Sequence, residues 1–245
     1  MNQLARVLIW LGAVCLLPMA KVLGQEVDIK IDKRYEGLVA AWDFDGSLEE
    51  EISKKKLKPN KGTATFFDDA GGRQDAALLV QKGQFFGETY DKLPIGDSER
   101  TIMFWYTKDE CTADIALLQF GNNSKPRGTV NIRARPCDQW GKYFTVSFVP
   151  DLNGVHKFHD AHKSTLFNGA WIHVAITYKS RQAVNFYYNG VQNNVYSENR
   201  DKINTASGDA HFGWVTNPDA NDESVIGLDK ARVFSQRLSA AQIKK

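Results

Sequence analysis

The hydrophobic pattern of the chain is clearest over residues 170–190, where apolar and polar side chains alternate. Ile172, Val174, Ile176 and Tyr178 occupy every second position, and 184–188 repeat that period after a polar break. A period of two is that of a β-strand, whereas a helix needs apolar residues spaced by three and four. The dipeptide at 189–190, Asn-Gly, then supplies the positive φ angles of a tight turn. This stretch predicts hairpin-linked strands that need further strands to form a stable sheet.

The same pattern recurs at regular spacing along the rest of the chain. Further strands are predicted at 38–44, 63–67, 76–80, 101–107, 115–121, 129–135, 141–149, 191–196, 210–215 and 225–234. Ser239 is a favourable N-cap for one helical turn that ends at Ile243. Many short strands with a single terminal helical turn predict an all-β fold, an antiparallel β-sandwich of the jelly-roll type with a short C-terminal helical turn.

Residues 1–24 have the pattern of a secretory signal peptide, with a basic start, an apolar run at 7–17 and compact residues before the expected cleavage point. A membrane anchor is the disfavoured alternative, because the run is roughly half of what a bilayer span requires. We expect a loose lead-in at 25–37 and one domain at 38–245, since no Pro/Gly/Ser-rich linker or repeat divides the chain. The mature protein is therefore predicted to be secreted and extracellular.

Charge and cysteine content narrow the classes of partner. A formal net charge of +2 is too small to indicate nucleic acid or a membrane surface. Cys15 leaves with the signal peptide, so that Cys111 and Cys137 remain as an even pair in an oxidising compartment. If the strands around them form a meander, both cysteines lie at one end of the sheet and can form a disulfide. Two free thiols are the alternative.

Two sequence features bear on glycans, one as an attachment site and one as a possible binding site. Asn122 begins an Asn-Asn-Ser sequon, which predicts a glycoprotein. The segment 54–61 contains a cluster of lysines, namely Lys54, Lys55, Lys56, Lys58 and Lys61. This cluster could hold a sulfated glycan, although a solvated loop is the favoured interpretation.

Four segments of the chain resemble a known family. They are LVAAWDFDGS, RTIMFWYTKD, WIHVAITY with VNFYYNG, and GLDKARVFSQRLSAAQI. In that order they are similar to the opening strand, the tryptophan-bearing strand, the diagnostic strand pair and the closing strand of laminin G-like domains. Residues 38–243 thus resemble the laminin G-like jelly roll of the concanavalin A-like lectin/glucanase superfamily, which is related to the pentraxins. The resemblance implies a sandwich in which the first and last strands are neighbours, but a fold alone does not determine a function.

The resemblance also implies a calcium site where the two ends of the domain meet. Asp45 would end the first strand, Asp229 lies in the last, and Asp43 would share a strand face with Asp45. Calcium binds six to eight oxygens, which can include backbone carbonyls and water. Lys230 departs from the family, which often has a second acidic residue there. In the alternative, Asp45 and Asp229 are capped by backbone amides or paired with Arg232 or Lys230.

Candidate ligand-binding residues combine guanidinium and aromatic groups. They are Arg133, Arg135, Trp140, Tyr143 and His173. A guanidinium fork suits sulfate or carboxylate, and aromatic faces suit sugar rings. Trp140 could instead cover the disulfide loop, and His173 could be a satisfied strand histidine.

No catalytic pattern accompanies these residues. Glycan-cleaving relatives need two carboxylates across a cleft, commonly as Glu-x-Asp-x-x-Glu on one strand, and the sequence contains no such strand. We therefore expect a secreted, non-catalytic module that binds a carbohydrate or an extracellular matrix component, with calcium as the candidate cofactor. A structural matrix protein without a discrete pocket, including a mineral-associated one, is the alternative. A divergent glycoside hydrolase is less favoured.

Overall fold

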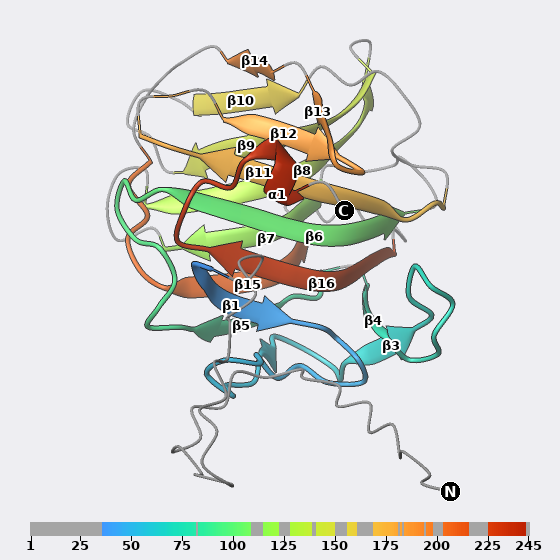
Figure 1. The fold of residues 1–245 in the computed structure, drawn as a ribbon. Helices are drawn as coiled ribbons and strands as arrows, with labels where there is room; N and C mark the ends of the chain where they lie inside the picture. The colour runs from blue at the N-terminus through green and yellow to red at the C-terminus, as the bar shows by residue number, and fades with distance from the viewer. Residues whose placement is uncertain are drawn as a thin grey trace, which may run out of the picture.

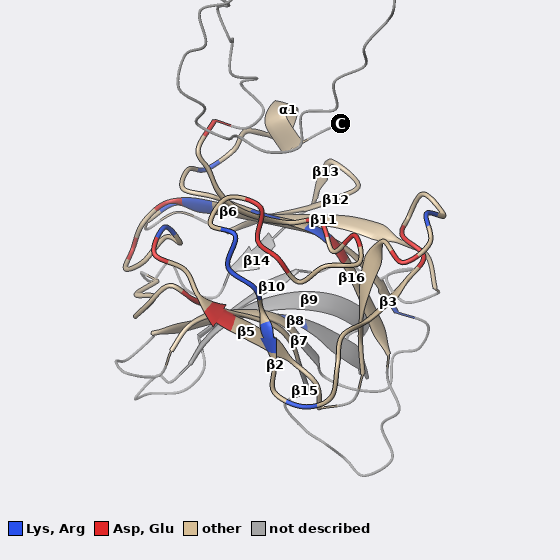
Figure 2. Cartoon of the chain, turned by 90° about the horizontal axis from the view of Figure 1, so that it is seen from below, with Lys and Arg blue, Asp and Glu red and all other residues tan. Residues whose placement is uncertain are grey.

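Two antiparallel β-sheets face each other in the computed structural model, one in front of the other in Figure 1 and one above the other in Figure 2. The structure describes residues 36–81, 83–108, 115–122, 128–138, 141–149, 156–160, 169–180, 182, 184–193, 195–197, 203–215 and 225–243. For 115–116, 134–138, 141–149, 156–160, 195–197 and 214–215 it describes the backbone only. The predicted all-β sandwich is confirmed.

The front sheet contains the strands that the sequence pattern marks most clearly. Its order is β13 (Val191–Asn193), β12 (Asn185–Tyr188), β11 (Ile172–Tyr178), β6 (Arg100–Lys108), β16 (Ile226–Phe234), β4 (Ala77–Val80) and β3 (Thr65–Phe67), and β1 (Leu38–Trp42) also pairs with β16. The turn from β12 to β13 has φ angles of 49° at Asn189 and 78° at Gly190. These angles confirm the turn predicted from the Asn-Gly dipeptide.

The back sheet departs from the prediction in two ways. Its order is β14 (Val195–Ser197), β10 (His156–Asp160), β9 (Gly141–Val149), β8 (Thr129–Asp138), β7 (Ile115–Gly121), β15 (Asp209–Val215), β5 (Phe86–Thr89) and β2 (Lys58–Pro59). The predicted meander was wrong at its start, because β6 and β7 belong to different sheets. The polar sequence at 153–163 predicts a loop, but the structure has strand β10 at His156–Asp160, next to the sheet edge, where a strand tolerates polar residues.

The cysteine pairing falls outside what the structure describes. Cys137 lies inside β8 rather than just beyond it, and its side chain is not among those described. Cys111 also lies outside the described residues, as do residues 1–35 with the predicted signal peptide. The disulfide and the signal peptide stay predictions.

The two ends of the domain meet, as predicted. Strand β1 pairs antiparallel with β16, with Leu38 opposite Phe234. The helix α1 (Ala240–Ile243) comes after β16, and the backbone N–H of Gln242 donates to Ser239 Oγ at 3.4 Å. Buried Ile243 packs with Phe234 in a small apolar cluster on the outer side of the front sheet, where Figure 1 shows α1.

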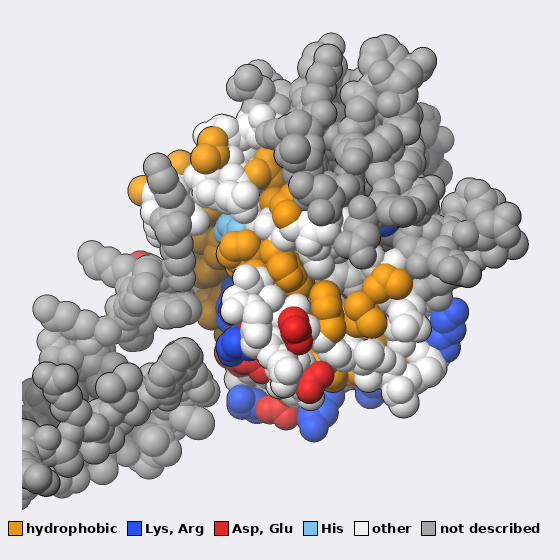
Figure 3. All heavy atoms as spheres, turned by 90° about the vertical axis from the view of Figure 1, so that its right-hand side faces the viewer, with side chains coloured by type: hydrophobic (Ala, Val, Ile, Leu, Met, Phe, Trp, Pro, Cys, Tyr) orange, Lys and Arg blue, Asp and Glu red, His pale blue; other side chains and the backbone are white. Residues whose placement is uncertain are grey.

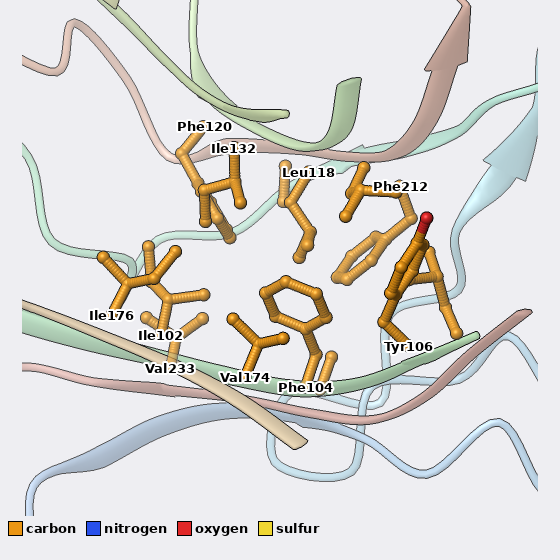
Figure 4. Packing of buried hydrophobic residues seen from close by; sticks show 14 of the residues in the cluster. Ile102, Phe104, Tyr106, Leu118, Phe120, Ile132, Val174, Ile176, Phe212 and Val233 are labelled. Atoms are coloured by element: carbon orange, nitrogen blue, oxygen red, sulfur yellow. The ribbon is translucent and has the colours of Figure 1, made fainter. Parts of the chain in front are cut away.

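The core lies between the sheets (Figure 4). Alternate residues of β6 and β11 enter it, including Phe104 and Val174, and meet Leu118 and Phe212 from the back sheet. Because successive side chains of a strand point to opposite faces, the residues between these core positions must point outward. The outer face of the front sheet is therefore built from the other half of the alternating pattern.

A bulge in β16 interrupts that alternation. The pairing with β6 shifts between Asp229 and Arg232, and Lys230 has φ 46°. Leu228 and Ala231 are both core residues, although an even strand would place them on opposite faces. Read as a regular strand, the sequence at 225–234 predicts that Gly227, Asp229, Ala231 and Val233 share one face. This prediction was wrong, since an extra residue at the bulge reverses the facing of the later residues in the strand.

Candidate functional site

Two aromatic pairs lie on the outer face of the front sheet. Trp105 and His173 are direct partners across β6 and β11, with ring centroids 5.4 Å apart and planes tilted by 53°. Phe67 and Trp171 stack at 5.6 Å with planes 22° apart. All four are half-buried, and Trp171 lies two residues from His173 on the same side of the chain. We call these four residues the aromatic platform.

Gly227 forms the floor beneath one of these rings. A Cβ atom at this position would lie 2.3 Å from Phe67 Cζ and 2.6 Å from Thr107 Cγ2. Only a residue without a side chain leaves room for Phe67 to lie across β16. Phe67 thereby extends from β3, at the end of the sheet, to reach Trp171 beside β11.

The carboxylate of Asp229 lies beside the platform. Asp229 is opposite Trp105 in the pairing of β16 with β6, so that both side chains share the outer face. It is fully buried, and Lys230 Nζ donates to its Oδ2 at 2.7 Å and to Asp69 Oδ2 at 3.2 Å. Among the residues that the structure describes, none forms a hydrogen bond with Asp229 Oδ1. Burial raises the pKa of Asp229 to about 6, against the lowering effect of Lys230.

Asp69 connects the Asp229–Lys230 pair, through Arg73, to Asp45, which follows β1. The backbone N–H groups of Gly71 and Arg73 donate to its Oδ1 at 2.8 and 2.9 Å, and Arg73 Nε donates to its Oδ2 at 2.8 Å. Burial alone would raise the pKa of Asp69, but these bonds hold it well below its usual range. The guanidinium of Arg73 also forks to the two oxygens of Asp45 at 2.9 and 3.0 Å.

A second carboxyl pair, Asp43 and Glu51, lies in the segment that follows β1. Asp43 accepts a hydrogen bond from Arg232, which also donates to the Trp42 carbonyl at 3.0 Å. Asp43 also shares a hydrogen bond with Glu51, which together with burial raises the pKa of Glu51 to about 7. Figure 2 shows these acidic and basic positions close together at the end of the sandwich beside β3 and β16.

The three carboxylates predicted to bind calcium do not fit a shared ion as they are placed. Asp43 pairs with Arg232, Asp45 with Arg73 and Asp229 with Lys230. Strand β1 ends at Trp42 and Phe44 has φ 56°, so that Asp43 and Asp45 do not continue one strand face. In the described part of the chain, no group of three His, Cys, Asp or Glu residues could hold a metal ion. Calcium binding by the protein stays a prediction.

The predicted ligand-binding residues fall in both sheets. Arg135 and Tyr143 are direct partners across β8 and β9, two residues along from Arg133, so the back sheet brings these positions together. The side chains of Arg135 and Tyr143 and the whole of Trp140 lie outside what the structure describes. His173 is on the front sheet and joins the aromatic platform instead.

Three platform residues, Trp171, Trp105 and Phe67, were not among the binding candidates predicted from the sequence. The alternation at 170–178 shows that Trp171 and His173 share the face opposite the core residues, so that Trp171 could have been found from the sequence. Trp105 was noted as a family tryptophan without a binding role. The approach of Phe67 depends on contacts between distant segments and has no sequence signal.

Four of the five lysines in the cluster at 54–61 lie near a carboxylate, so that the cluster is partly neutralised. Lys54 and Lys56 lie 3.6 and 3.9 Å from Glu49, Lys55 lies 3.5 Å from Asp91, and Lys58 lies 2.7 Å from Glu88, in each case measured from Nζ to a carboxylate oxygen. This arrangement favours a solvated loop over a sulfated-glycan site. At the sequon, Asn122 Nδ2 donates to Asp209 Oδ2 at 2.9 Å.

A laminin G-type family model, described as the concanavalin A-like lectin/glucanases superfamily, matches residues 87–244. The chain belongs to this superfamily. The matched region begins in β5 and ends just after α1, and includes Trp105, Trp171, His173 and Asp229. No curated protein matches the chain.

Solved structures of the same fold come from much larger binding proteins. Botulinum neurotoxin type C, described as entering cells through interaction with two ganglioside molecules, is 11% identical over 86% of this chain and 50% of that chain, with a TM-score of 0.66. The binding domain of paraclostridial mosquitocidal protein 1 is 14% identical over 86% and 52%, with a TM-score of 0.65. This chain spans about half the length of the chains it matches. At these identities, the likeness shows a shared fold.

One further finding concerns membranes. Among the described residues, no helix has the length and hydrophobicity that a membrane crossing requires.

Proposed function

We propose that this superfamily member is a secreted, non-catalytic carbohydrate-binding module and that sugar rings stack on the aromatic platform. The observation that carries this proposal is the half-exposed stacked pair of Phe67 and Trp171 beside Trp105 and His173. Aromatic faces next to a few well-placed polar groups are typical of ligand sites. Figure 3, which views the molecule from the right-hand side of Figure 1, shows hydrophobic side chains forming a band above acidic and basic groups.

The comparisons support a binding role. The family is named for lectins as well as glucanases, and the structural neighbours are described as binding domains, one of them through its interaction with gangliosides. The absence of a Glu-x-Asp-x-x-Glu strand from the sequence favours binding over hydrolysis. Secretion, the Cys111–Cys137 disulfide, glycosylation at Asn122 and an extracellular matrix partner belong to the same proposal.

A glycan array tests this function. The mature chain, 25–245, is produced in a secretory host and applied with and without a chelator, and any hit is measured by calorimetry. We expect binding to a defined sugar class, with Trp171→Ala reducing affinity by about tenfold, which corresponds to the loss of one aromatic contact. Val191→Ala is the matched control, because Val191 is an exposed apolar residue on β13 that is not part of the platform.

The outcomes separate the candidate functions. Silence across the array would contradict the proposal and favour a structural matrix protein. Binding that survives Trp171→Ala unchanged would move the site elsewhere, with the Arg133 face of the back sheet as the next candidate. Turnover of a polysaccharide would indicate a divergent glycoside hydrolase.

A further inference from the structure

We infer that the ammonium group of Lys230 occupies the position a metal ion would take between β16 and the loop after β3, and so positions the platform without calcium. The inference deepens the proposed function, since it names the residue that holds the proposed binding surface in place. Only its consequence for sugar binding rests on the proposed function.

The first argument is charge. The Lys230 ammonium lies 2.7 Å from Asp229 Oδ2 and 3.2 Å from Asp69 Oδ2, and the two carboxylate side chains are 0% and 2% exposed. Arg73 compensates Asp69 from the other side, but without a cation between the two carboxylates the buried Asp229 would lie desolvated next to a like charge. In metal-binding proteins calcium fills that need, and here a side chain supplies the cation.

The second argument is the shape of β16. In a regular strand, residues 229 and 230 would point to opposite faces, and Lys230 would enter the core. The bulge and the positive φ of Lys230 instead bring its ammonium to the same side as Asp229. A left-handed backbone at a lysine is unfavourable, and such conformations persist only where surrounding contacts fix them. The contacts here are those with the two carboxylates.

The third argument is unused coordinating capacity. Asp229 Oδ1 is buried and has no hydrogen-bond partner in the described part of the chain, although buried polar atoms are nearly always satisfied. Without the ammonium, Asp229 Oδ2 and Asp69 Oδ2 would also lose a donor. These are hard oxygen ligands of the kind that calcium prefers. Removal of the lysine would therefore expose a latent cation site.

The consequence for the platform arises from chain connectivity. Asp69 lies two residues after Phe67, and Arg73 fixes Asp69 from the other side. By holding Asp69 against β16, Lys230 holds the end of β3 on the sheet and Phe67 over Gly227. Lys230 is thus a positioning residue, which need not touch the sugar.

Thermal melts with calcium and with a chelator test the inference. Wild-type protein should melt within about 1 °C of the same midpoint in either, since its cation is covalently attached. Lys230→Met should melt roughly 5–15 °C lower in chelator, and about 10 mM calcium should recover at least about 3 °C of that loss. The matched control is Lys58→Met, which removes an exposed lysine from a single surface pair and should show neither effect.

A second variant distinguishes the loss of the cation from a simple packing defect. Lys230→Met combined with Asp229→Asn removes one buried carboxylate together with the cation, and should melt above Lys230→Met and lose the response to calcium. If Lys230→Met does not fold in chelator, refolding it from urea with calcium should restore folded protein. Calcium stabilisation of the wild type, or a Lys230→Met midpoint that calcium does not change, would overturn the inference. The melts involve no sugar, so they can fail while the proposed function stands, and the glycan array can fail while the inference stands.

Discussion

The ring of Phe67 covers Gly227 so closely that a Cβ atom there would lie 2.3 Å from Phe67 Cζ. The Gly227→Ala substitution should therefore displace Phe67 and break its stack with Trp171. We expect a loss of roughly 1–3 kcal/mol in the free energy of unfolding, as is typical when a packed site is overfilled. Sugar binding should weaken by about tenfold, in line with the loss of an aromatic contact. Urea unfolding and calorimetry measure the two effects.

Gly96→Ala is the matched control for this substitution. Gly96 has φ 60° but open space around its Cα, so alanine there is strained without meeting another side chain. It lies before β6, at the opposite end of that strand from Thr107. It should lower stability by about 1 kcal/mol and leave sugar binding unchanged. Equal loss of binding in both variants would mean that instability, and not the position of Phe67, controls affinity.

Glu51 should make the protein less stable as the pH rises toward neutrality. The hydrogen bond with Asp43 and burial raise the pKa of Glu51 from 4.5 to about 7 in the folded protein. The folded state then binds this proton more tightly than the unfolded state, so the contribution is fully present below pH 4.5 and is lost as pH rises through 7. Asp229, with its pKa raised to about 6, acts in the same direction at lower pH. Melting midpoints should fall between pH 6 and pH 8.

The variant Glu51→Gln isolates this effect. A glutamine amide can still donate to Asp43 but does not titrate, so the fall in midpoint above pH 6 should become smaller. Glu88→Gln is the control, because the hydrogen bond from Lys58 lowers the pKa of Glu88 and restricts its effect to pH values below 4.5. An unchanged slope above pH 6 in Glu51→Gln would show that the Asp43–Glu51 pair does not control stability there.

Alternation along the chain was enough to predict the strands, because a two-residue period results directly from backbone geometry. It correctly placed Ile172 and Val174 on the core face, whereas the pairing of β1 with β16 was implied by the family resemblance. It could not show that β6 and β7 belong to different sheets, since alternation marks which face of a strand is apolar and not which neighbour it pairs with. The fold class was therefore predictable, and the connection after β6 was not.

The candidate site was less predictable, because it depends on one irregular residue and on distant partners. The bulge at Lys230 reverses the faces of β16, and no local pattern in that segment signals it. The residue that pairs with Asp45 is Arg73, from a loop 28 positions away. Lys230 was recognised as a departure from the family, but its role as partner to both Asp229 and Asp69 becomes clear only in the folded chain.

The lysine cluster at 54–61 should bind sulfated glycans only weakly. Glu49 lies near both Lys54 and Lys56, and Glu88 near Lys58, so these charges are partly compensated within the protein. The double variant Glu49→Gln with Glu88→Gln should elute from a heparin column at higher salt than wild type, because the freed lysines can bind sulfate.

Glu99→Gln is the matched control for the heparin experiment. It removes a carboxylate paired with Lys179 at 2.7 Å, away from the cluster, and should elute close to wild type. If the two variants shift equally for each carboxylate removed, net charge and not the local cluster governs retention. Strong retention of the wild type would contradict the neutralised-loop interpretation.

Arg100 should be the most sensitive charged residue at the far end of the front sheet. Its buried guanidinium donates to the Gly96 and Ser98 carbonyls at 3.0 Å each and to Thr205 Oγ1 at 2.7 Å. Burial lowers its pKa to about 10, so it stays charged at neutral pH. Arg100→Met leaves these acceptors without a donor and should cost about 2–4 kcal/mol of unfolding free energy, measured in urea. Arg237→Met, which loses a bond to the exposed Gln182 and a positive charge near Glu99, should cost less than about 1 kcal/mol. Equal losses in the two variants would show that the guanidinium network does not anchor the loop before β6.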